Sequence, residues 1–258
     1  MKTIILCGGL GTRLREETEY RPKALVEIGG RPILWHIMKL YAHHGFREFV
    51  LALGYRGNMI KDYFLNYEAM NNDFAISLGR GNAVEYLGAH DEQDFRVTLA
   101  ETGADTMTGG RVKAAARYID EDRFMVTYGD GVTDLDLTAV LAFHRAHGRL
   151  ATVTTARTSS RYGIVEMSDD GSVEQFVEKP ELQGWASMGF FVFERAALDY
   201  IDGPATVLER EPLERLAEAG ELMAFRHPGF FFSMDTYREY EYLNSLWSSG
   251  NPPWRVWT

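Results

Sequence analysis

Short runs of apolar residues recur along the first part of the chain, and glycine or other turn residues end several of them. Runs of this length are typical of strands that are buried on both faces of a sheet. The pattern therefore predicts strands at Thr3–Cys7, Phe49–Leu53, Val97–Glu101, Phe124–Tyr128 and Ala151–Thr155.

Segments with helical spacing of apolar residues lie between these runs. Pro32 suits the first turn of a helix, and apolar side chains then recur on one face until His43. The helices expected in this part are Pro32–His43, Asn58–Asn66, Gly110–Tyr118 and Asp136–His147. Strands that alternate with helices favour a parallel sheet covered by helices on both faces. The polar stretch between Asn66 and Val97 is expected to be irregular.

The pattern changes in the second half, where turn residues such as Asp169–Gly171 separate the apolar segments and indicate antiparallel pairing. The expected strands are Ile164–Met167, Val173–Glu178 and Phe190–Phe193, and the expected helices are Thr206–Ala219 and Arg238–Ser248. The predicted fold is α/β: a Rossmann-like mixed, mostly parallel sheet flanked by helices, with an antiparallel portion, in a single domain over residues 1–258.

Composition narrows the classes of protein that fit. A hydrophobic content of 45% allows one large core without disulfides, and the single Cys7 sits among apolar neighbours as a small buried residue. The formal charge of −10 argues against a nucleic-acid-binding surface. No segment approaches the about 20 apolar residues that cross a bilayer, and the N-terminus lacks the pattern of a signal peptide. We expect a cytoplasmic protein without a membrane segment.

The first strand runs into the glycine-rich segment Gly8–Arg13, whose small residues allow backbone N–H groups to approach a phosphate closely. The dinucleotide fingerprint would need a third glycine at position 14, which is Leu14, and no Gly-Lys-Ser/Thr follows as in a P-loop. The segment alone fits a nucleotide-binding loop or a tight structural turn.

Cationic residues are concentrated just after this loop of an otherwise acidic chain: Arg13, Arg15, Arg21 and Lys23. Such a cluster indicates a site for anions, and Pro22 would stiffen the chain before Lys23. A solvated basic loop is the alternative.

Motifs along the whole chain resemble the sugar-1-phosphate nucleotidyltransferases, also called NDP-sugar pyrophosphorylases, and most closely their glucose-1-phosphate cytidylyltransferase branch. The matching segments, in family order, are Gly8–Arg13, Pro22–Lys23, Val26–Met38, Thr108–Arg111, Tyr128–Gly131, Glu178–Pro180, Glu211–Leu213, His227–Phe230 and Met234–Thr236. The combination is far more specific than any one motif.

The resemblance implies a reaction and its partners. An oxygen of a sugar 1-phosphate attacks the α-phosphorus of a nucleoside triphosphate, with CTP as the expected nucleotide, and pyrophosphate leaves in line. It also implies that residues 1–150 mainly bind the nucleotide and residues 151–258 mainly bind the sugar, and that the protein forms a homo-oligomer.

Asp130 and Asp235 match the carboxylates that hold Mg²⁺ in this family. Two carboxylates brought together by the fold suit a hard cation that takes its other ligands from water and phosphates. Without the resemblance, Asp130 could equally be a helix cap or turn residue, and Asp235 could cap the helix that follows Thr236.

Site residues carry over from the resemblance by position. The expected catalytic residues are Arg13, Lys23, Asp130, Lys179 and Asp235. The expected nucleotide-binding residues are Leu6, Gly8, Gly9, Gly11, Thr12, Arg13, Lys23, Thr106, Gly110, Arg111 and Gly129. The expected sugar-phosphate-binding residues are Tyr128, Glu178, Lys179, Ser187, Met188 and Gly189.

For two of these residues, a position without a binding role is also possible. The planar donors of Arg111 suit a cytosine carbonyl, but Arg111 could also be an exposed helix residue. Lys179 would draw in the attacking phosphate, but it could also be a surface lysine at a strand end.

The chain departs from the family at Ser187-Met188-Gly189, where the cytidylyltransferases typically have Asn-Gly-Gly. Serine is shorter than asparagine and Met188 adds bulk, and an unpaired hydroxyl of the substrate would cost about 1–3 kcal/mol. A deoxysugar, heptose or cyclitol phosphate is therefore an alternative acceptor to glucose 1-phosphate.

Other readings stay open. The same reaction with UTP, dTTP or GTP is one alternative, and a non-catalytic nucleotide-binding regulatory subunit is another. Several histidines and tryptophans are expected to be structural, through packing or exposure for the former and packing or a subunit contact for the latter: His36, His43, His44, His144, His147, Trp247, Trp254 and Trp257.

Overall fold

A computed structural model describes residues 1–9, 11–79, 81–157, 163–178 and 184–257. Among these residues, seven strands form the central sheet in the order β14-β10-β13-β8-β1-β4-β7. Their bounds are Thr3–Cys7 (β1), Glu48–Leu53 (β4), Arg96–Glu101 (β7), Arg123–Tyr128 (β8), Ala151–Ala156 (β10), Ala186–Glu194 (β13) and Leu222–His227 (β14). All the strands predicted for the first part of the chain are confirmed.

Within this sheet, β13 runs opposite to the other strands. It pairs antiparallel with β8 and β10, whereas β8, β1, β4 and β7 pair in parallel and β14 runs parallel to β10. The predicted mixed, mostly parallel sheet is therefore confirmed. Because the other strands point the same way, their carboxyl ends meet at one edge.

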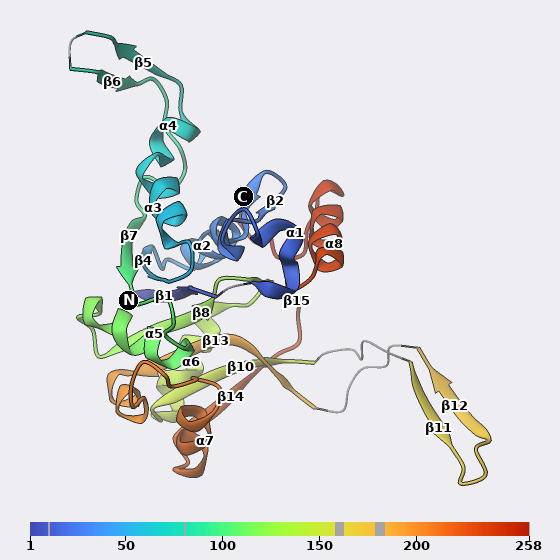
Figure 1. Cartoon of the computed structure of the whole chain (residues 1–258). Coiled ribbons are helices and arrows are strands. Elements are labelled where there is room, and N and C mark those ends of the chain that lie inside the picture. The colour runs from blue at the N-terminus through green and yellow to red at the C-terminus, as the bar shows by residue number, and fades with distance from the viewer. Residues whose placement is uncertain (10, 80, 158–162, 179–183, 258) are drawn as a thin grey trace.

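Helices cover both faces of the sheet (Figure 1). Alternate residues of each strand point to opposite faces, so Ile5 and Leu51 pack in one core cluster while Ile4 and Val50 pack in the other. The first cluster includes residues of α2 (Ile33–His43), α6 (Leu137–His147) and α8 (Tyr237–Ser248), and the second includes residues of α5 (Thr108–Ala115) and α7 (Glu211–Glu218).

Two hairpins stand away from the sheet (Figure 1). One hairpin is β11 (Ile164–Met167) with β12 (Val173–Val177), which confirms the predicted antiparallel pairing there. The other is β5 (Phe74–Ser77) with β6 (Ala83–Tyr86), and it follows α3 (Gly57–Leu65) and α4 (Tyr67–Asn71). The expectation of an irregular stretch between Asn66 and Val97 is therefore wrong.

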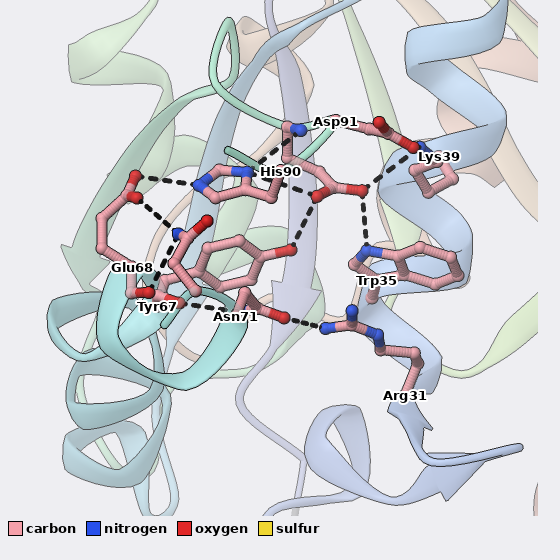
Figure 2. A network of polar contacts seen from close by, with 10 residues as sticks. Arg31, Trp35, Lys39, Tyr67, Glu68, Asn71, His90 and Asp91 are labelled. Atoms are coloured by element: carbon pink, nitrogen blue, oxygen red, sulfur yellow. Dashed lines mark hydrogen bonds and ion pairs between the residues drawn. The ribbon is translucent and has the colours of Figure 1, made fainter. Parts of the chain in front are cut away.

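The base of the β5–β6 hairpin is anchored to α2 by a polar network, in which Trp35 and Lys39 face Tyr67 and His90 (Figure 2). The buried carboxylate of Glu92 accepts hydrogen bonds from the Trp35 indole at 3.0 Å and from the Tyr67 hydroxyl at 3.2 Å. The ammonium of Lys39 lies 3.2 Å from the same carboxylate. These contacts attach the base of the hairpin to the body of the protein.

The C-terminal tail packs on α2. Trp254 and Trp257 are buried, and the Trp254 indole donates a hydrogen bond to Nδ1 of the buried His36. The ring of Trp247 lies edge-on to His36. The structural interpretation of these tryptophans and of His36 is confirmed.

Short elements complete the described chain: η1 (Thr12–Leu14), α1 (Arg15–Thr18), η2 (Lys23–Leu25), β2 (Glu27–Ile28), β3 (Arg31–Pro32), η3 (Ala116–Tyr118), β9 (Gly131–Thr133), η4 (Arg195–Tyr200) and β15 (Phe231–Ser233). The α7 helix begins at Glu211, five positions later than expected, and Pro212 lies in its first turn. None of the helices in the described ranges is long and apolar enough to cross a membrane.

Candidate active site at the carboxyl ends of the strands

Strand register brings two distant aspartates together at the carboxyl edge of the sheet. Asp130 follows β8 and precedes β9, and β9 pairs antiparallel with β15 so that Gly131 lies opposite Ser233. The backbone N–H of Met234 then donates to the carbonyl of Asp130 at 2.9 Å. Asp235, the next residue, is thereby placed beside Asp130.

Lys23 joins the two aspartates. Its Nζ lies 2.6 Å from Oδ2 of Asp130 and 2.7 Å from Oδ1 of Asp235. Arg13 donates to the same Asp235 oxygen at 3.0 Å, but its side chain is 68% exposed whereas those of Lys23 and Asp235 are 15% exposed. A mostly buried ammonium thus lies between two carboxylates, and the exposed guanidinium of Arg13 contacts one of them.

The two aspartates stabilise the protonated form of Lys23. Burial lowers the pKa of the ammonium, but the charges and hydrogen bonds of Asp130 and Asp235 outweigh it, and the pKa is raised above its ordinary value. Lys23 is therefore a cation at neutral pH.

The start of α8 fixes the backbone of Asp235. Thr236 is the N-cap residue, and the carboxylate of Glu239 accepts from the N–H groups of Asp235 at 2.7 Å and Thr236 at 2.8 Å. The alternative that Asp235 caps this helix is wrong, because Thr236 does. The side chain of Asp235 is thus left to Lys23 and Arg13.

Arg111 is buried rather than exposed, so the alternative of an ordinary surface arginine is wrong. Its guanidinium donates to the Thr102 hydroxyl at 2.8 Å and to backbone carbonyls of the surrounding loops. These carbonyls belong to Gly8, Leu53, Gly103 and Ala104. Burial lowers the pKa of Arg111. The side chain ties the glycine loop to the end of β4 and to the loop that follows β7.

The glycine at position 8 is required by this guanidinium. A Cβ added at Gly8 would lie 2.3 Å from Cζ of Arg111, and one added at Gly54 would lie 2.4 Å from its Nη1. Both positions therefore admit no side chain while Arg111 stays in place. Gly9 differs, because nothing lies within 4 Å of its added Cβ.

These residues surround a cleft of about 590 Å³. The predicted site residues that line it are Leu6, Gly8, Gly9, Gly11, Thr12, Arg13, Lys23, Thr106, Arg111, Tyr128, Gly129, Asp130 and Asp235. Residues that the sequence analysis did not predict also line it: Cys7, Ala24, Ala104, Asp105, Met107 and Thr108. Most of these follow β7, and their place at the carboxyl end of a predicted parallel strand is the signal that could have found them.

Cys7 lines the cleft as a structural residue, as expected. It is buried, and burial together with the negative charge of Asp130 raises the pKa of its thiol to about 12. The thiol therefore stays protonated and is a poor nucleophile at neutral pH.

The family profile described as "Nucleotidyl transferase" matches residues 2–224. The chain belongs to the nucleotidyl transferase family. A glucose-1-phosphate cytidylyltransferase from Salmonella typhi is 48% identical over the full length of both chains. A protein of Bacillus subtilis strain 168, named "Probable glucose-1-phosphate cytidylyltransferase", is 43% identical, again over both full lengths.

The fold of this nucleotidyl transferase is shared with solved structures. The crystal structure of a UDP-glucose pyrophosphorylase complexed with UDP-glucose superposes with a TM-score of 0.70 over 97% of this chain and 99% of the other, at 14% identity. At that identity the likeness concerns the fold alone.

Some predicted site residues of the nucleotidyl transferase lie outside the described cleft. A Cβ at Gly110 would lie 2.6 Å from the carbonyl oxygen of Pro204, so Gly110 serves close packing of α5. Met188 is buried in the core, so its bulk does not enter the cleft. Gly189 has φ +75° and lies against the ring of Tyr128.

The remaining sugar-phosphate candidates are placed only in part. Ser187 accepts a hydrogen bond from the N–H of Gly189 at 3.2 Å, and Glu178 is exposed next to the end of β12. Lys179 lies outside the described residues. The hydroxyl of Tyr128 is buried without a hydrogen-bond partner in the described part of the chain, on a residue that lines the cleft.

Proposed function

We propose that this nucleotidyl transferase moves CMP from CTP to glucose 1-phosphate, giving CDP-glucose and pyrophosphate. The observation that carries the proposal is full-length similarity to proteins named glucose-1-phosphate cytidylyltransferase, together with the cleft that gathers Lys23, Asp130 and Asp235. A regulatory subunit is not favoured, because the described catalytic candidates all meet in that cleft.

The reaction needs little covalent help from the protein. An oxygen of the sugar phosphate forms a bond to the α-phosphorus while the bond from that phosphorus to the pyrophosphate oxygen breaks. Both reactants are polyanions, so the protein must bring them together and stabilise charge on the leaving group. Backbone N–H groups of the glycine loop, Lys23 and the exposed Arg13 are the groups of the cleft that suit this task.

The pair Asp130 and Asp235 fits Mg²⁺. Both carboxylates already contact one cation, the ammonium of Lys23, so they can present oxygens to a single ion. Among the described residues, no group of three or more His, Cys, Asp or Glu side chains is placed to hold a metal. Mg²⁺ suits a two-carboxylate site, because it keeps waters and takes substrate phosphates as ligands. When bound, it would neutralise phosphate charge and act as a Lewis acid.

The acceptor is proposed to be glucose 1-phosphate in spite of Ser187-Met188. Met188 packs in the core, and the backbone at Gly189 contacts Tyr128, so the departure from the family changes packing behind the cleft more than the cleft itself. Lys179 keeps its predicted role at the acceptor phosphate. We further propose that the enzyme acts in the cytoplasm, where CTP is available.

We also propose that the enzyme is a homo-oligomer. Every residue of β5 and β6 is exposed, including Phe74, Ile76, Val84 and Tyr86. An isolated two-stranded hairpin with exposed apolar side chains is only marginally stable in water. Contact with a second copy of the chain would bury these side chains.

Charge-neutral substitutions of the two aspartates test the proposed chemistry. With CTP, glucose 1-phosphate and Mg²⁺, Asp130→Asn and Asp235→Asn should each lower pyrophosphate release by about a hundredfold or more. The control is Asp169→Asn, which removes an exposed carboxylate from the β11–β12 turn and should leave the rate unchanged. Rates in the two site variants equal to that of the control would refute the roles of Asp130 and Asp235.

A further inference from the structure

Lys23 lies between the two carboxylates that are proposed to hold the metal ion. Its ammonium lies within hydrogen-bond distance of Oδ2 of Asp130 and Oδ1 of Asp235, at 2.6 and 2.7 Å. Side-chain exposure at the three residues is between 15% and 29%, so water competes only weakly for these contacts. The lysine is therefore the cation shared by both carboxylates, whereas Arg13 contacts Asp235 alone.

The position of Lys23 is set by its backbone. Lys23 begins the short η2 helix directly after Pro22, whose φ of −65° is fixed by its ring. Ala24 and Leu25, which follow, are buried in the core. The Cα of Lys23 is thus held in place, and only its flexible side chain can move.

Arg13 cannot replace Lys23 in this contact. It reaches Asp235 but has no contact with Asp130 in the described structure, and its side chain is largely exposed. A guanidinium at the mouth of the cleft is placed to meet an incoming anion rather than to fill the space between the aspartates.

We propose that Lys23 is the internal counter-ion of the metal site and must exchange partners before a divalent cation binds. On this proposal, which rests on the proposed function, the ammonium leaves Asp130 and Asp235 when the phosphates of the nucleotide arrive. The carboxylates then turn to the metal that accompanies the nucleotide.

The physical basis is competition for the same oxygens. Without a nucleotide, the ammonium of Lys23 already contacts one oxygen of each carboxylate. It also repels a divalent cation at short range, because both carry positive charge. A triphosphate offers the ammonium a new anionic partner and adds oxygen ligands for the metal. Metal and nucleotide therefore bind cooperatively, and each raises the affinity of the other by the same factor.

Manganese ions serve as the probe, because their binding can be followed by calorimetry and by electron paramagnetic resonance without turnover. Mn²⁺ is titrated into nucleotide-free protein, and preformed Mn–CTP is titrated separately in the absence of any sugar phosphate. The wild type should bind Mn²⁺ alone weakly. Lys23→Met should bind Mn²⁺ at least about tenfold more tightly, which corresponds to about 1.4 kcal/mol of binding free energy.

Control variants separate the exchange from a general effect of lost charge. Lys61→Met removes an ammonium that pairs with Glu101 on the surface and should leave the Mn²⁺ affinity at the wild-type value. Lys23→Arg keeps a cation and should also gain nothing. The double variant Lys23→Met with Asp130→Asn should lose the gain in Mn²⁺ affinity. That result would show that the additional Mn²⁺ binds at the aspartate pair.

Lys23→Met leaves Asp130 and Asp235 without the cation that they share, so it should lose stability, and thermal unfolding then gives a second measurement. Mn²⁺ should then raise the Tm of Lys23→Met clearly more than that of the wild type. Lys23→Gln, which keeps a donor without the charge, should behave in the same way.

The outcomes distinguish this inference from the proposed function. If the wild type binds Mn–CTP but Lys23→Met binds Mn²⁺ no more tightly than the wild type, the counter-ion role is overturned and the metal site stands. If neither protein binds Mn²⁺ or Mn–CTP, the metal site fails and the counter-ion role fails with it.

Discussion

His36 is held as a neutral imidazole by the partners of its two nitrogens. Nε2 lies 2.9 Å from the carbonyl of Ile28 and Nδ1 accepts from the indole of Trp254 at 3.3 Å, which requires a proton on Nε2 and none on Nδ1. Burial lowers the pKa of His36 from 6.5 to about 4. Its neutral form ties the C-terminal tail to α2.

The stability of the protein should therefore depend on the protonation of His36. Because the pKa is lower in the folded state, this contribution is complete above about pH 6.5 and is lost as the pH falls towards about 4. His36→Gln should be less stable than the wild type by about 1–3 kcal/mol at pH 7.5, and the difference should shrink by pH 4.5. Urea unfolding at both pH values measures this, and parallel pH profiles would contradict it.

Two neighbouring glycines should respond differently to a single methyl group. At Gly8 the added Cβ meets the buried, fully engaged guanidinium of Arg111, so Gly8→Ala should cost about 1–3 kcal/mol of stability. Gly9→Ala adds its Cβ in open space and should change stability by less than about 0.5 kcal/mol. Equal losses in chemical denaturation would show that Arg111 does not constrain the loop.

At the residue scale, sequence reasoning was strongest where a residue type and its place after a strand pointed to the same chemistry. Asp130, Lys23 and the glycine loop meet in the cleft, as expected. It could not foresee packing. Gly110 and Met188 are closely packed and do not line the cleft, because their surroundings come from segments distant in sequence, such as Pro204 for Gly110.

At the element scale, the start of α8 couples helix stability to the site. Thr236→Ala removes the N-cap side chain and should cost about 1 kcal/mol, and it should also lower kcat/KM about tenfold because Asp235 shares the Glu239 contact. Asp136→Ala removes the N-cap of α6, a helix end that does not line the cleft. It should cost similar stability with no change in kcat/KM. Equal kinetic effects in the two variants would contradict this coupling.

Elements with strong local periodicity were predictable and those that depend on distant partners were not. The continuous apolar runs of β1, β4 and β8 indicate buried strands from the sequence alone. The helical spacing of apolar residues likewise indicates α2. The β5–β6 hairpin escaped prediction because both its strands are exposed and lack a buried face to impose alternation.

At the scale of the whole molecule, the β5–β6 hairpin should matter for assembly. Ile76→Glu places a charge on an exposed apolar position that a partner copy would cover, so it should lower the oligomer mass measured by light scattering. Tyr118→Glu, an exposed position in η3, should leave the mass unchanged. A wild type that is monomeric at micromolar concentration would refute the proposed oligomer.

The most direct test of the proposed function is pyrophosphate release by the purified protein with glucose 1-phosphate, Mg²⁺ and one triphosphate at a time. We expect kcat/KM with CTP to exceed the values with UTP, dTTP and GTP by about a hundredfold. Absence of turnover with CTP and glucose 1-phosphate, alongside turnover of another triphosphate or of a deoxysugar, heptose or cyclitol phosphate, would contradict the proposed substrates.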